Sequence, residues 1–395
     1  MKESTSLPPT NGAKARYIMI GGFLGAGKTT AVGKLARKLT DQGLRVGLIT
    51  NDQGRNLVDT AMLRSQGFAT EEIPGGCFCC RFNTLVEASQ KLTASTRPEV
   101  FIAEPVGSCT DLVATVTYPL RRLYGNDFTV APVTVLVDPI RAERIFGLSK
   151  GGNFSEKVVY IYLKQIEEAD LIVISKCDQL DPMRLEALRQ AIAAKYPKKE
   201  ILAVSVRNGT NVDAWFSRIS RGEQNAAQAM EVDYQTYAEG EALLGWLNCT
   251  VQLSAELEFD AEDVLTQLAV EIQKRLQAEK AEVAHLKMTL SPDESVTGEI
   301  AAVHLVRSDF VPELSFQLED PVKSGQLIIN LRAEGDPDGL AEAVRQGLAA
   351  AAKQVSGLTA ALDHLEHFRP GKPTPTHRDS PGSNACCAPD CGCKR

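Results

Sequence analysis

The sequence predicts an α/β fold in which a doubly wound, mostly parallel sheet carries helices on both faces. Two observations predict it. Short apolar runs alternate with amphipathic helical patterns through residues 15–221, which is typical of a parallel sheet. Gly22–Thr29 has the spacing G-x-x-x-x-G-K-T and lies between the first apolar run and the first helical pattern. A smaller α+β domain and a disordered tail rich in Cys and His are predicted to follow.

The stretch Gly22–Thr29 is predicted to bind phosphate, which makes the first domain a P-loop NTPase. Its glycines let backbone N–H groups turn toward phosphate oxygens, and the helix that follows adds the positive end of its dipole. Lys28 is expected to reach the β- and γ-phosphates, and the Thr29 hydroxyl to bind Mg²⁺. A glycine-rich turn that matches by chance is the alternative. The residues expected to bind phosphate are Gly22, Gly25, Ala26, Gly27, Lys28, Thr29 and Thr30.

Carboxylates follow two further predicted strands, where ligands meet a parallel sheet. We expect Asp52 to reach Mg²⁺, directly or through water, or to orient a water; the alternative is that it caps the next helix. Glu104 is expected to hold a Mg²⁺ water, and the Gly107 N–H to approach the γ-phosphate; the alternative is a solvated Glu104 in a turn. With Lys28, Asp52 and Glu104 are the candidate catalytic residues, and either carboxylate could orient the attacking water.

The tetrapeptide Ser175-Lys176-Cys177-Asp178 follows another predicted strand and indicates a preference for GTP. An Asp178 carboxylate can accept two hydrogen bonds from the N1–H and N2 amine of guanine, a pattern that adenine lacks. The Lys176 stem is expected to cover the base, and Ser205 to line the base pocket through its backbone. A P-loop kinase that tolerates adenine is the competing interpretation.

Cys77, Cys79 and Cys80 precede an amphipathic helix and indicate a transition-metal site. A helix N-terminus favours thiolates, and sulfur ligands select zinc, copper(I) or cobalt over magnesium. Three protein ligands leave a fourth position open for a transferable metal. The alternatives are three small buried side chains or, less favoured, a redox pair. Cys109 could lend a fourth sulfur, but we expect it to be a small buried residue.

Together these motifs resemble the CobW-type family of P-loop GTPases, relatives of UreG and HypB that serve as metallochaperones. The resemblance spans about residues 16–220 and rests on the phosphate loop, Gly76-Cys77-Phe78-Cys79-Cys80, Glu104-Pro105-Val106-Gly107 and Ser175-Lys176-Cys177-Asp178. It implies GTP, Mg²⁺ and either Zn²⁺ or Co²⁺ as ligands. It assigns phosphate and Mg²⁺ to Gly25, Gly27, Lys28, Thr29 and Thr30, γ-phosphate sensing to Glu104 and Gly107, guanine to Lys176 and Asp178, and cargo metal to Cys77, Cys79 and Cys80.

Two features depart from that family. Asn51-Asp52-Gln53-Gly54-Arg55 stands where the family often has Asn-Glu-Phe-Gly-Glu, which puts the switch chemistry in doubt at Gln53 and Arg55. The family's basic C-terminal motif is not evident after residue 240, so the second domain is open to a different client.

The function predicted from the resemblance is a GTP-hydrolysing metallochaperone. It would deliver zinc or cobalt to a client metalloprotein or a corrinoid pathway protein in a nucleotide-dependent way. The alternatives are a GTP-dependent metal store or sensor without delivery, and an accessory protein of corrinoid biosynthesis or activation. The resemblance also allows a GTP-dependent homodimer.

Composition narrows the partners. Of 395 residues, 24% are charged and 44% hydrophobic, as in ordinary globular proteins. A net charge of -7 gives no footprint for nucleic acid or an anionic membrane surface. No run of about 18 apolar residues predicts a membrane span, and the first residues lack a signal core. Ten cysteines in a long chain fit a reducing compartment, so we expect a cytoplasmic protein.

The chain is divided into a flexible segment 1–14, the nucleotide domain 15–221, a linker 222–240, an α+β domain 241–358 and a tail 359–395. The second domain is predicted from strands at 247–253, 284–290, 299–306 and 326–331 and helices at 261–276 and 340–355.

The tail is predicted to collect metal. His364 and His367 would share one helical face, and His377 and four cysteines follow them, Cys386, Cys387, Cys391 and Cys393. The alternative is an incidental tail. His285 and His304 have no partners at ligand spacing and are interpreted as structural.

Overall fold

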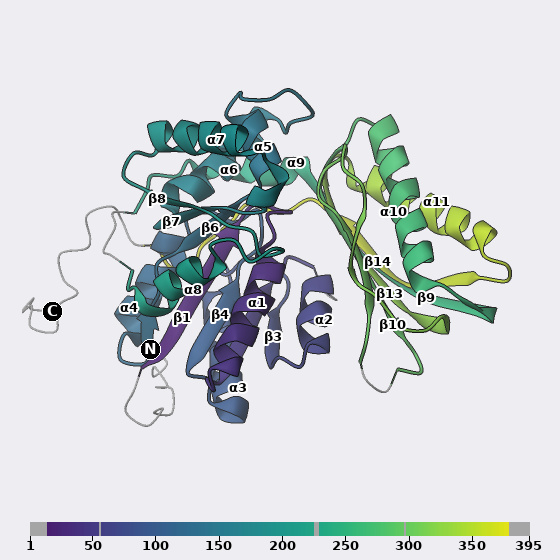
Figure 1. Ribbon diagram of the computed structural model, residues 1–395, viewed down its shortest axis with the longest axis horizontal. Helices are drawn as coiled ribbons and strands as arrows, with labels where there is room; N and C mark the ends of the chain where they lie inside the picture. The colour runs from purple at the N-terminus through teal and green to yellow at the C-terminus, as the bar shows by residue number, and fades with distance from the viewer. Residues whose placement is uncertain (1–13, 55–56, 225–228, 296–297, 379–395) are drawn as a thin grey trace, which may run out of the picture.

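The computed structural model describes residues 14–54, 57–224, 229–295 and 298–378. Arg55 and the four cysteines after residue 385 lie outside the described residues. Two sheets, each layered with helices, make up this part of the chain (Figure 1). No helix in it is long and apolar enough to cross a membrane.

The first sheet is parallel and has the strand order β3-β2-β4-β1-β6-β7-β8, with β5 paired beside β1. Its strands are β1 (Ala15–Gly22), β2 (Val46–Asn51), β3 (Thr70–Ile73), β4 (Val100–Glu104), β5 (Phe128–Val130), β6 (Thr134–Val137), β7 (Leu171–Ile174) and β8 (Glu200–Ala203). The helices are α1 (Lys28–Asp41), α2 (Val58–Ser65), α3 (Phe82–Thr96), α4 (Tyr118–Tyr124), α5 (Pro139–Ile145), α6 (Glu156–Glu168), α7 (Pro182–Lys195), α8 (Val212–Arg221) and α9 (Tyr234–Leu243).

Alternation along the strands explains the two helical layers. In β1, Ile18 and Ile20 pack with α1 and α8 on one face, while Tyr17 and Met19 pack with α3, α4 and α6 on the other. A strand buried on both faces has a continuously apolar sequence, which is why these strands were predictable. The predicted doubly wound α/β fold is confirmed.

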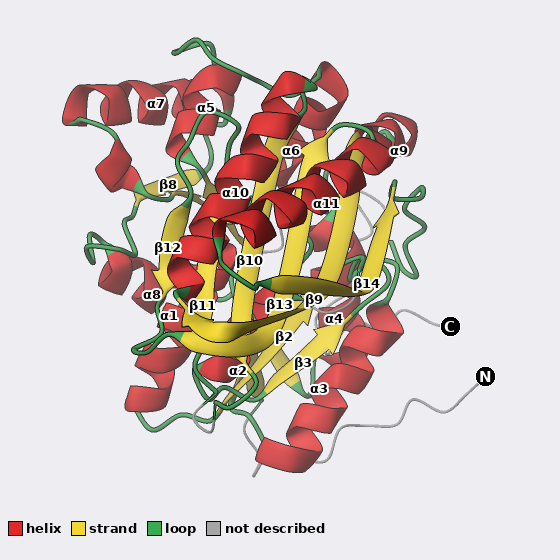
Figure 2. Ribbon diagram, turned by 90° about the vertical axis from the view of Figure 1, so that its right-hand side faces the viewer, coloured by secondary structure: helices red, strands yellow, loops and turns green. Residues whose placement is uncertain are grey.

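The second sheet is antiparallel, with the order β12-β11-β10-β13-β9-β14. Its strands are β9 (Leu244–Phe259), β10 (Glu282–Pro292), β11 (Ala301–Leu305), β12 (Glu313–Phe316), β13 (Val322–Glu334) and β14 (Thr359–Phe368). The helices α10 (Ala261–Ala278) and α11 (Pro337–Gln354) cover one face of it (Figure 2).

The other face of the second sheet packs on the first domain. It carries polar side chains at alternate positions, and they are nonetheless buried: Asn248, His285, Thr289, Asn330 and Arg332. Trp246 and Ala284, on the same face, belong to the hydrophobic cluster of the first domain. We call this the polar face of the second sheet. It places the second domain directly against the edge of the first sheet where ligands are expected.

Two predicted segments differ from the structure. The expected linker contains α9, which begins at Tyr234 and packs against α6. The expected tail begins with a strand, because residues 359–368 form β14 and pair with β9. His364 and His367 therefore do not share a helical face, since side chains three apart on a strand point to opposite sides.

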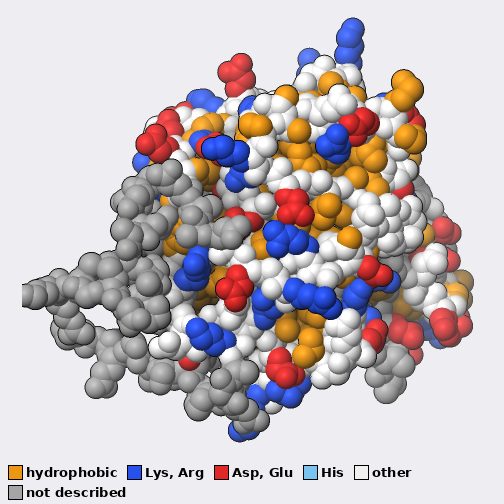
Figure 3. Space-filling model, turned by 60° about the vertical axis from the view of Figure 1, so that its left-hand side comes forward, with side chains coloured by type: hydrophobic (Ala, Val, Ile, Leu, Met, Phe, Trp, Pro, Cys, Tyr) orange, Lys and Arg blue, Asp and Glu red, His pale blue; other side chains and the backbone are white. Residues whose placement is uncertain are grey.

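Charged side chains of both signs are interspersed over the face drawn in Figure 3. Neither sign forms a continuous field among the described residues on that face, in keeping with the modest net charge of the chain.

Candidate functional site

The loop between β1 and α1 has the backbone geometry of a phosphate loop. Gly22, Gly25 and Gly27 have φ of 130°, 79° and 91°, values that side-chain-bearing residues rarely adopt. At Gly22 a Cβ would also lie 2.4 Å from the Leu136 carbonyl oxygen. Helix α1 begins at Lys28, with Gly27 in the capping position and no capping side chain. The first N–H groups of α1 are thus left to a ligand.

Three oxygen ligands converge beside this loop. The Thr29 hydroxyl oxygen lies 2.6 Å from Asp59 Oδ1 and 3.0 Å from Glu104 Oε1. Hydroxyl and carboxylate oxygens are the ligands that Mg²⁺ prefers. Glu104 Oε2 is buried, and among the described residues nothing donates a hydrogen bond to it. Burial, followed by repulsion from Asp59, raises the pKa of Glu104 to about 7. These residues therefore fit a Mg²⁺ ion.

Asp59 was not among the predicted site residues. It lies in the first turn of α2, a helix that was predicted but treated only as a helix. The available signal was its position: it is the first carboxylate in the helix that follows the loop after β2.

The second domain adds a cation to this site. Lys287, on the polar face of β10, forms an ion pair with Asp59, and its Nζ lies 3.4 Å from Thr29 Oγ1. Burial opposes the charge on Lys287, but the charges of Asp59 and Glu104 raise its pKa overall. Lys28 lies in the same cluster, and its burial lowers its pKa. His285 lines the small cavity beside these groups, about 80 Å³ in volume.

Asp52 is bound by the second domain. Its Oδ1 accepts hydrogen bonds from the Gly54 N–H at 3.1 Å and from Arg332 Nη2 at 2.9 Å. Arg332 is fully buried, and its guanidinium lies over the Trp246 ring at 4.1 Å. The alternative role of Asp52 as a helix cap is wrong, because Leu57 occupies the capping position of α2. A role in Mg²⁺ binding or water orientation stays a prediction.

The close contact of the two domains depends on Gly54. A Cβ at this position would lie 1.5 Å from the side-chain amide nitrogen of Asn248, so a larger residue would force the Asn248 side chain or the loop after β2 to move.

A cavity of about 530 Å³ lies beyond the phosphate loop, within the usual size of a ligand pocket. The residues predicted to bind the base, Lys176, Asp178 and Ser205, all line it. Lys176 crosses over the loop and donates hydrogen bonds to the Gly25 carbonyl at 2.7 Å and to Asp138 Oδ2 at 2.9 Å. Asp178 is exposed on the cavity wall. The Ser205 N–H is already donated to the Thr210 carbonyl, so it is engaged within the protein.

The second domain also forms part of this cavity. Its lining includes His304 and residues 313–316 of β12. The His304 ring is hydrogen-bonded to Ser315 and lies near Glu313, which also pairs with Arg207 of the first domain. The cavity is therefore lined by both domains.

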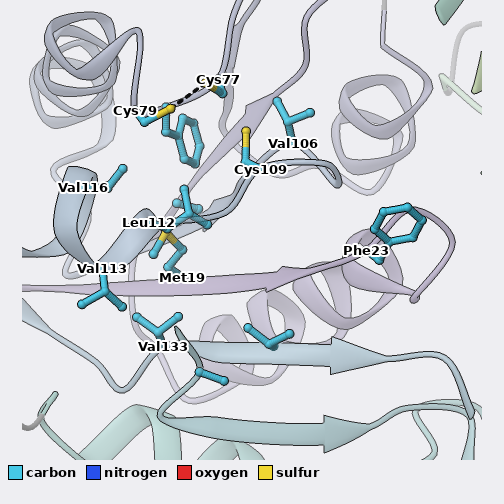
Figure 4. Close-up of a cluster of buried hydrophobic side chains, with 14 of the residues drawn as sticks. Met19, Phe23, Cys77, Cys79, Val106, Cys109, Leu112, Val113, Val116 and Val133 are labelled. Carbon is cyan, nitrogen blue, oxygen red and sulfur yellow. Dashed lines mark hydrogen bonds between the residues drawn. The ribbon is translucent and has the colours of Figure 1, made fainter. Parts of the chain in front are cut away.

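The three predicted sulfur ligands lie together. Figure 4 shows the sulfurs of Cys77 and Cys79 facing each other. The Sγ atom of Cys77 is 2.7 Å from that of Cys79 and 3.2 Å from that of Cys80, and Cys79 and Cys80 are 3.6 Å apart. A tetrahedral zinc site with bonds of about 2.3 Å sets its sulfurs about 3.8 Å apart, so the cluster needs to open by about 1 Å at most. Cys77 and Cys79 are buried and Cys80 is partly exposed, so metal exchange requires movement of neighbouring chain.

Cys109 is buried, as expected, and it lies against this cluster. Figure 4 shows its sulfur pointing toward those of Cys77 and Cys79. Its Sγ is not one of the ligand atoms that all lie within 4.8 Å of one another, which are those of Cys77, Cys79 and Cys80. The neighbouring thiols of Cys109, Cys79 and Cys80 hold the pKa of the Cys77 thiol well below its usual range. Thiols from two loops therefore lie side by side.

The chain after β14 returns to cover the sulfurs. We call residues 369–378 the return segment. The Thr374 N–H donates to Cys80 Sγ at 3.3 Å, and the Thr376 N–H donates to the Cys79 carbonyl at 2.8 Å. Arg378 donates to the buried Asp111 carboxylate at 2.7 Å, which fixes the end of the segment.

The histidines predicted to collect metal are not brought together. His377 packs edge-on against the Phe82 ring, His367 pairs with Asp338, and His364 lies near Glu366. Among the described residues, the group that could hold a metal ion contains Cys77, Cys79 and Cys80 and no histidine. The four tail cysteines are outside the described residues, so their role stays a prediction.

The fold, the phosphate loop and the pocket beside it define the first domain as a P-loop nucleotide-binding domain. Residues 16–203 match the family model described as "CobW/HypB/UreG, nucleotide-binding domain". This domain matches that family's model, which confirms the resemblance predicted from the motifs.

Curated relatives share this domain at moderate identity. A "Zinc chaperone CobW" of Sinorhizobium sp is 28% identical over 221 residues, covering 50% of this chain and 61% of the relative. A "Zinc chaperone YeiR" of Escherichia coli is 28% identical over 179 residues, covering 44% and 50%. A "Zinc-regulated GTPase metalloprotein activator 1" of Dictyostelium discoideum is 26% identical over 219 residues, covering 48% and 45%. The chain thus spans about half the length of the curated relatives it matches.

Among solved structures, HypB from Helicobacter pylori in complex with nickel is similar with a TM-score of 0.39. It is 16% identical and covers 54% of this chain and 91% of that one. This likeness carries no argument about function.

Proposed function

We propose that this protein is a GTP-hydrolysing metallochaperone that binds zinc or cobalt at Cys77, Cys79 and Cys80 and passes it to a client protein. One observation carries the proposal. The loop that begins at Glu104, beside the candidate Mg²⁺ site, ends at Cys109, beside the sulfur cluster. A conformational change at the triphosphate can therefore be transmitted to the metal site through five residues of chain.

The nucleotide part of the proposal assigns each residue a task. The phosphate loop and Lys28 hold the β- and γ-phosphates, and Asp178 selects guanine. Thr29, Asp59 and Glu104 would hold Mg²⁺, which when bound neutralises charge on the phosphate oxygens. Glu104 also orients the attacking water, because the other candidate, Asp52, is already engaged by Arg332. Water adds to the γ-phosphorus, the bond to the β-γ bridging oxygen breaks, and GDP and inorganic phosphate leave.

Delivery follows from the loss of the γ-phosphate. Gly107 would sense the γ-phosphate, and the loop that contains Gly107 would be released when the γ-phosphate leaves. Metal affinity would then differ between nucleotide states, and by linkage the metal would shift nucleotide affinity by the same factor. The relatives named as zinc chaperones support zinc as the cargo. Thiolates bind metal only when reduced, so the proposal places the protein in a reducing compartment.

A GTP-dependent metal store is the second candidate, and one observation favours it. The return segment covers the sulfur cluster, which would slow release of the metal. Delivery to a corrinoid pathway protein is the cobalt form of the first proposal.

The first experiment compares the wild type with Cys77→Ser/Cys79→Ser/Cys80→Ser. Zinc and cobalt content are measured by elemental analysis, together with GTP turnover. The variant is expected to lose the metal and to retain GTP binding. Cys249→Ala, which removes a buried thiol of β9 in the core of the second domain, is the matched control. Equal metal content in the triple variant and the wild type would remove the chaperone proposal.

The second experiment separates delivery from storage. Zinc-loaded protein is mixed with an apo zinc enzyme in the presence of GTP or of a non-hydrolysable analogue, and recovery of the acceptor's activity is followed. Faster recovery with GTP supports delivery, and equal rates support the store.

Asp178→Ala should reduce the preference for GTP over ATP, whereas an unchanged preference would contradict the assignment of the base pocket.

A further inference from the structure

We propose that Cys109 is a fourth metal ligand, so that the site is a four-thiolate site whose fourth sulfur is carried by the nucleotide-sensing loop. This inference rests on the proposed function, because it assumes that Cys77, Cys79 and Cys80 bind the metal.

The position of the thiol is the first step. Cys109 is 1% exposed and belongs to the same buried cluster as Cys77 and Cys79. Figure 4 shows the Cys109 sulfur pointing toward the sulfurs of Cys77 and Cys79. Its Sγ is not among the ligand atoms that all lie within 4.8 Å of one another, so binding of a shared metal would draw it closer. Zinc in proteins is bound most often by four ligands in a tetrahedron. With Cys109 the protein can supply all four, whereas the other three alone leave one position open.

A buried carboxyl group near the cluster, that of Glu241, is already engaged. Glu241 of α9 accepts a hydrogen bond from the Ser108 hydroxyl at 2.6 Å and lies 3.4 Å from the Gln53 amide nitrogen. The partly exposed Cys80 accepts from the Thr374 N–H of the return segment. Cys109 is therefore the sulfur that closes the site from the inside, while Cys80 faces the return segment.

The two groups of sulfurs belong to different parts of the fold. Cys77, Cys79 and Cys80 lie between β3 and α3, where the Cys77 carbonyl accepts the N–H groups of Cys80 and Arg81. Cys109 instead lies in the loop after β4. Its N–H donates to the Val106 carbonyl at 3.0 Å, so its position depends on the conformation of that loop.

The loop after β4 is held against both the phosphate loop and α6. A Cβ on Gly107 would lie 2.7 Å from Leu24 Cδ2 and 3.0 Å from the Leu24 nitrogen, so this glycine is in direct contact with the phosphate loop. On the other side, the buried Gln165 amide donates to the carbonyls of Gly107 at 2.9 Å and Cys109 at 2.8 Å. One buried side chain thus holds the Gly107 and Cys109 carbonyls together, so a displacement of Gly107 would be passed on to Cys109.

A mechanism for coupling follows from this arrangement. When Gly107 changes its contact with the γ-phosphate, the Cys109 sulfur shifts relative to the other three. The site then alternates between four thiolates, which hold the metal tightly, and three thiolates with an open position, from which the metal can leave. Removal of Cys109 should therefore abolish the dependence of metal affinity on nucleotide, rather than metal binding itself.

The test uses Co²⁺ as a probe in the full chain, because its sulfur-to-metal charge-transfer absorption grows with the number of bound thiolates. Four proteins are titrated: the wild type, Cys109→Ala, Cys80→Ala as a variant within the predicted site, and Cys249→Ala as a matched buried control. The charge-transfer absorption per Co²⁺ of Cys109→Ala is expected to fall to about three quarters of the wild-type value, as one ligand of four is lost. Cys249→Ala should match the wild type.

Zinc affinity gives a second readout. It is measured by competition with a chromophoric chelator, with and without a non-hydrolysable GTP analogue. Cys109→Ala is expected to lose at least about tenfold in affinity, the low end of what loss of even an outer-shell partner costs. Its affinity should also be the same in both nucleotide conditions, while that of the wild type differs. Unchanged GTP affinity and near-ultraviolet circular dichroism would show that the variant is folded.

The outcomes separate the two proposals. If Cys109→Ala matches the wild type in both readouts while Cys80→Ala does not, Cys109 is not a ligand and the proposed function stands. If the wild type gives no cobalt–thiolate absorption, the proposed function fails and the inference fails with it. If Cys109→Ala loses absorption but keeps the nucleotide dependence of the wild type, the coupling through the loop after β4 is refuted.

Discussion

The ion pair between Asp52 and Arg332 should couple the two domains by a measurable free energy. Arg332→Met leaves Asp52 without its counter-ion; removal of one partner of a buried pair costs about 3–5 kcal/mol. Because the Asp52 side chain is 11% exposed and keeps the Gly54 N–H, we expect the lower end, about 3 kcal/mol. Asp52→Asn keeps the acceptor oxygen but removes its charge, and should cost about 1.5 kcal/mol.

The double variant should lose no more free energy of unfolding than Arg332→Met alone. Without the guanidinium, the charge of Asp52 no longer stabilises the folded protein. The coupling energy is therefore about 1.5 kcal/mol, the full cost of Asp52→Asn. It is measured by urea unfolding followed by tryptophan fluorescence, with Trp215 in the first domain and Trp246 in the second. Coincident transitions at the two positions would justify a single free energy of unfolding.

The exposed pair Arg189 and Glu186, whose side chains are 46% and 48% exposed, serves as the control cycle. Its coupling should be below about 0.5 kcal/mol. A coupling between Asp52 and Arg332 as small as that of the control would refute the argument that the second domain holds the loop after β2.

Three further predictions concern other groups. Burial, then repulsion from Asp111, raises the pKa of Glu168 from 4.5 to about 8, so the folded protein keeps a proton that the unfolded chain releases. As the pH rises from 5 to 8, the free energy of unfolding should fall by up to about 1.4 kcal/mol per pH unit, and by less in Glu168→Gln. Equal shifts of the urea midpoint in the wild type and the variant would contradict this. Lys287→Met removes the cation that pairs with Asp59 and that would compete with Mg²⁺ for this carboxylate. Loading of a fluorescent GTP analogue should therefore need several-fold less Mg²⁺, and an unchanged Mg²⁺ requirement would contradict this competition. Arg378→Ala frees the return segment, so a chelator should extract zinc several-fold faster at unchanged GTP affinity, and an unchanged rate would show that the segment does not limit exchange.

The nucleotide domain was predictable because its signals are local. Each strand is an apolar run between helical patterns. Glu104 directly follows such a run, and Lys28 ends the glycine loop that follows another. Parallel topology brings these strand ends to one edge without any further information. The base pocket was predicted for the same reason, since Asp178 and Ser205 also follow strands.

The contribution of the second domain was not predictable from local pattern. Lys287 lies 228 residues from Asp59 in the sequence. In β10 it alternates with Leu286 and Met288, a pattern that usually means one face in the core and one in water. Here the polar face is buried against another domain, and the sequence of β10 alone does not reveal that cover.

The predictions for the two corrected segments differ from the structure for different reasons. Helix α9 turns Tyr237 and Glu241 inward, so it lacks the aliphatic spacing by which amphipathic helices are recognised. In β14, His364 and His367 have a spacing that suits one face of a helix, but hydrogen bonding to β9 decides in favour of a strand. Cys109 was assigned to the core because a single cysteine gives no spacing signal, and its neighbours come from another loop.

The polar face of the second sheet covers the first domain, and this contact limits which substitutions the sequence can accept. The family's usual Asn-Glu-Phe-Gly-Glu would put a longer acid where Asp52 meets Arg332, and an aromatic ring where Gln53 reaches Glu241. Grafting that pentapeptide into this chain should therefore push the domains apart unless position 332 is altered with it. Among homologues that keep this arrangement, we expect substitutions at positions 52 and 332 to occur in pairs, one on each side of the contact.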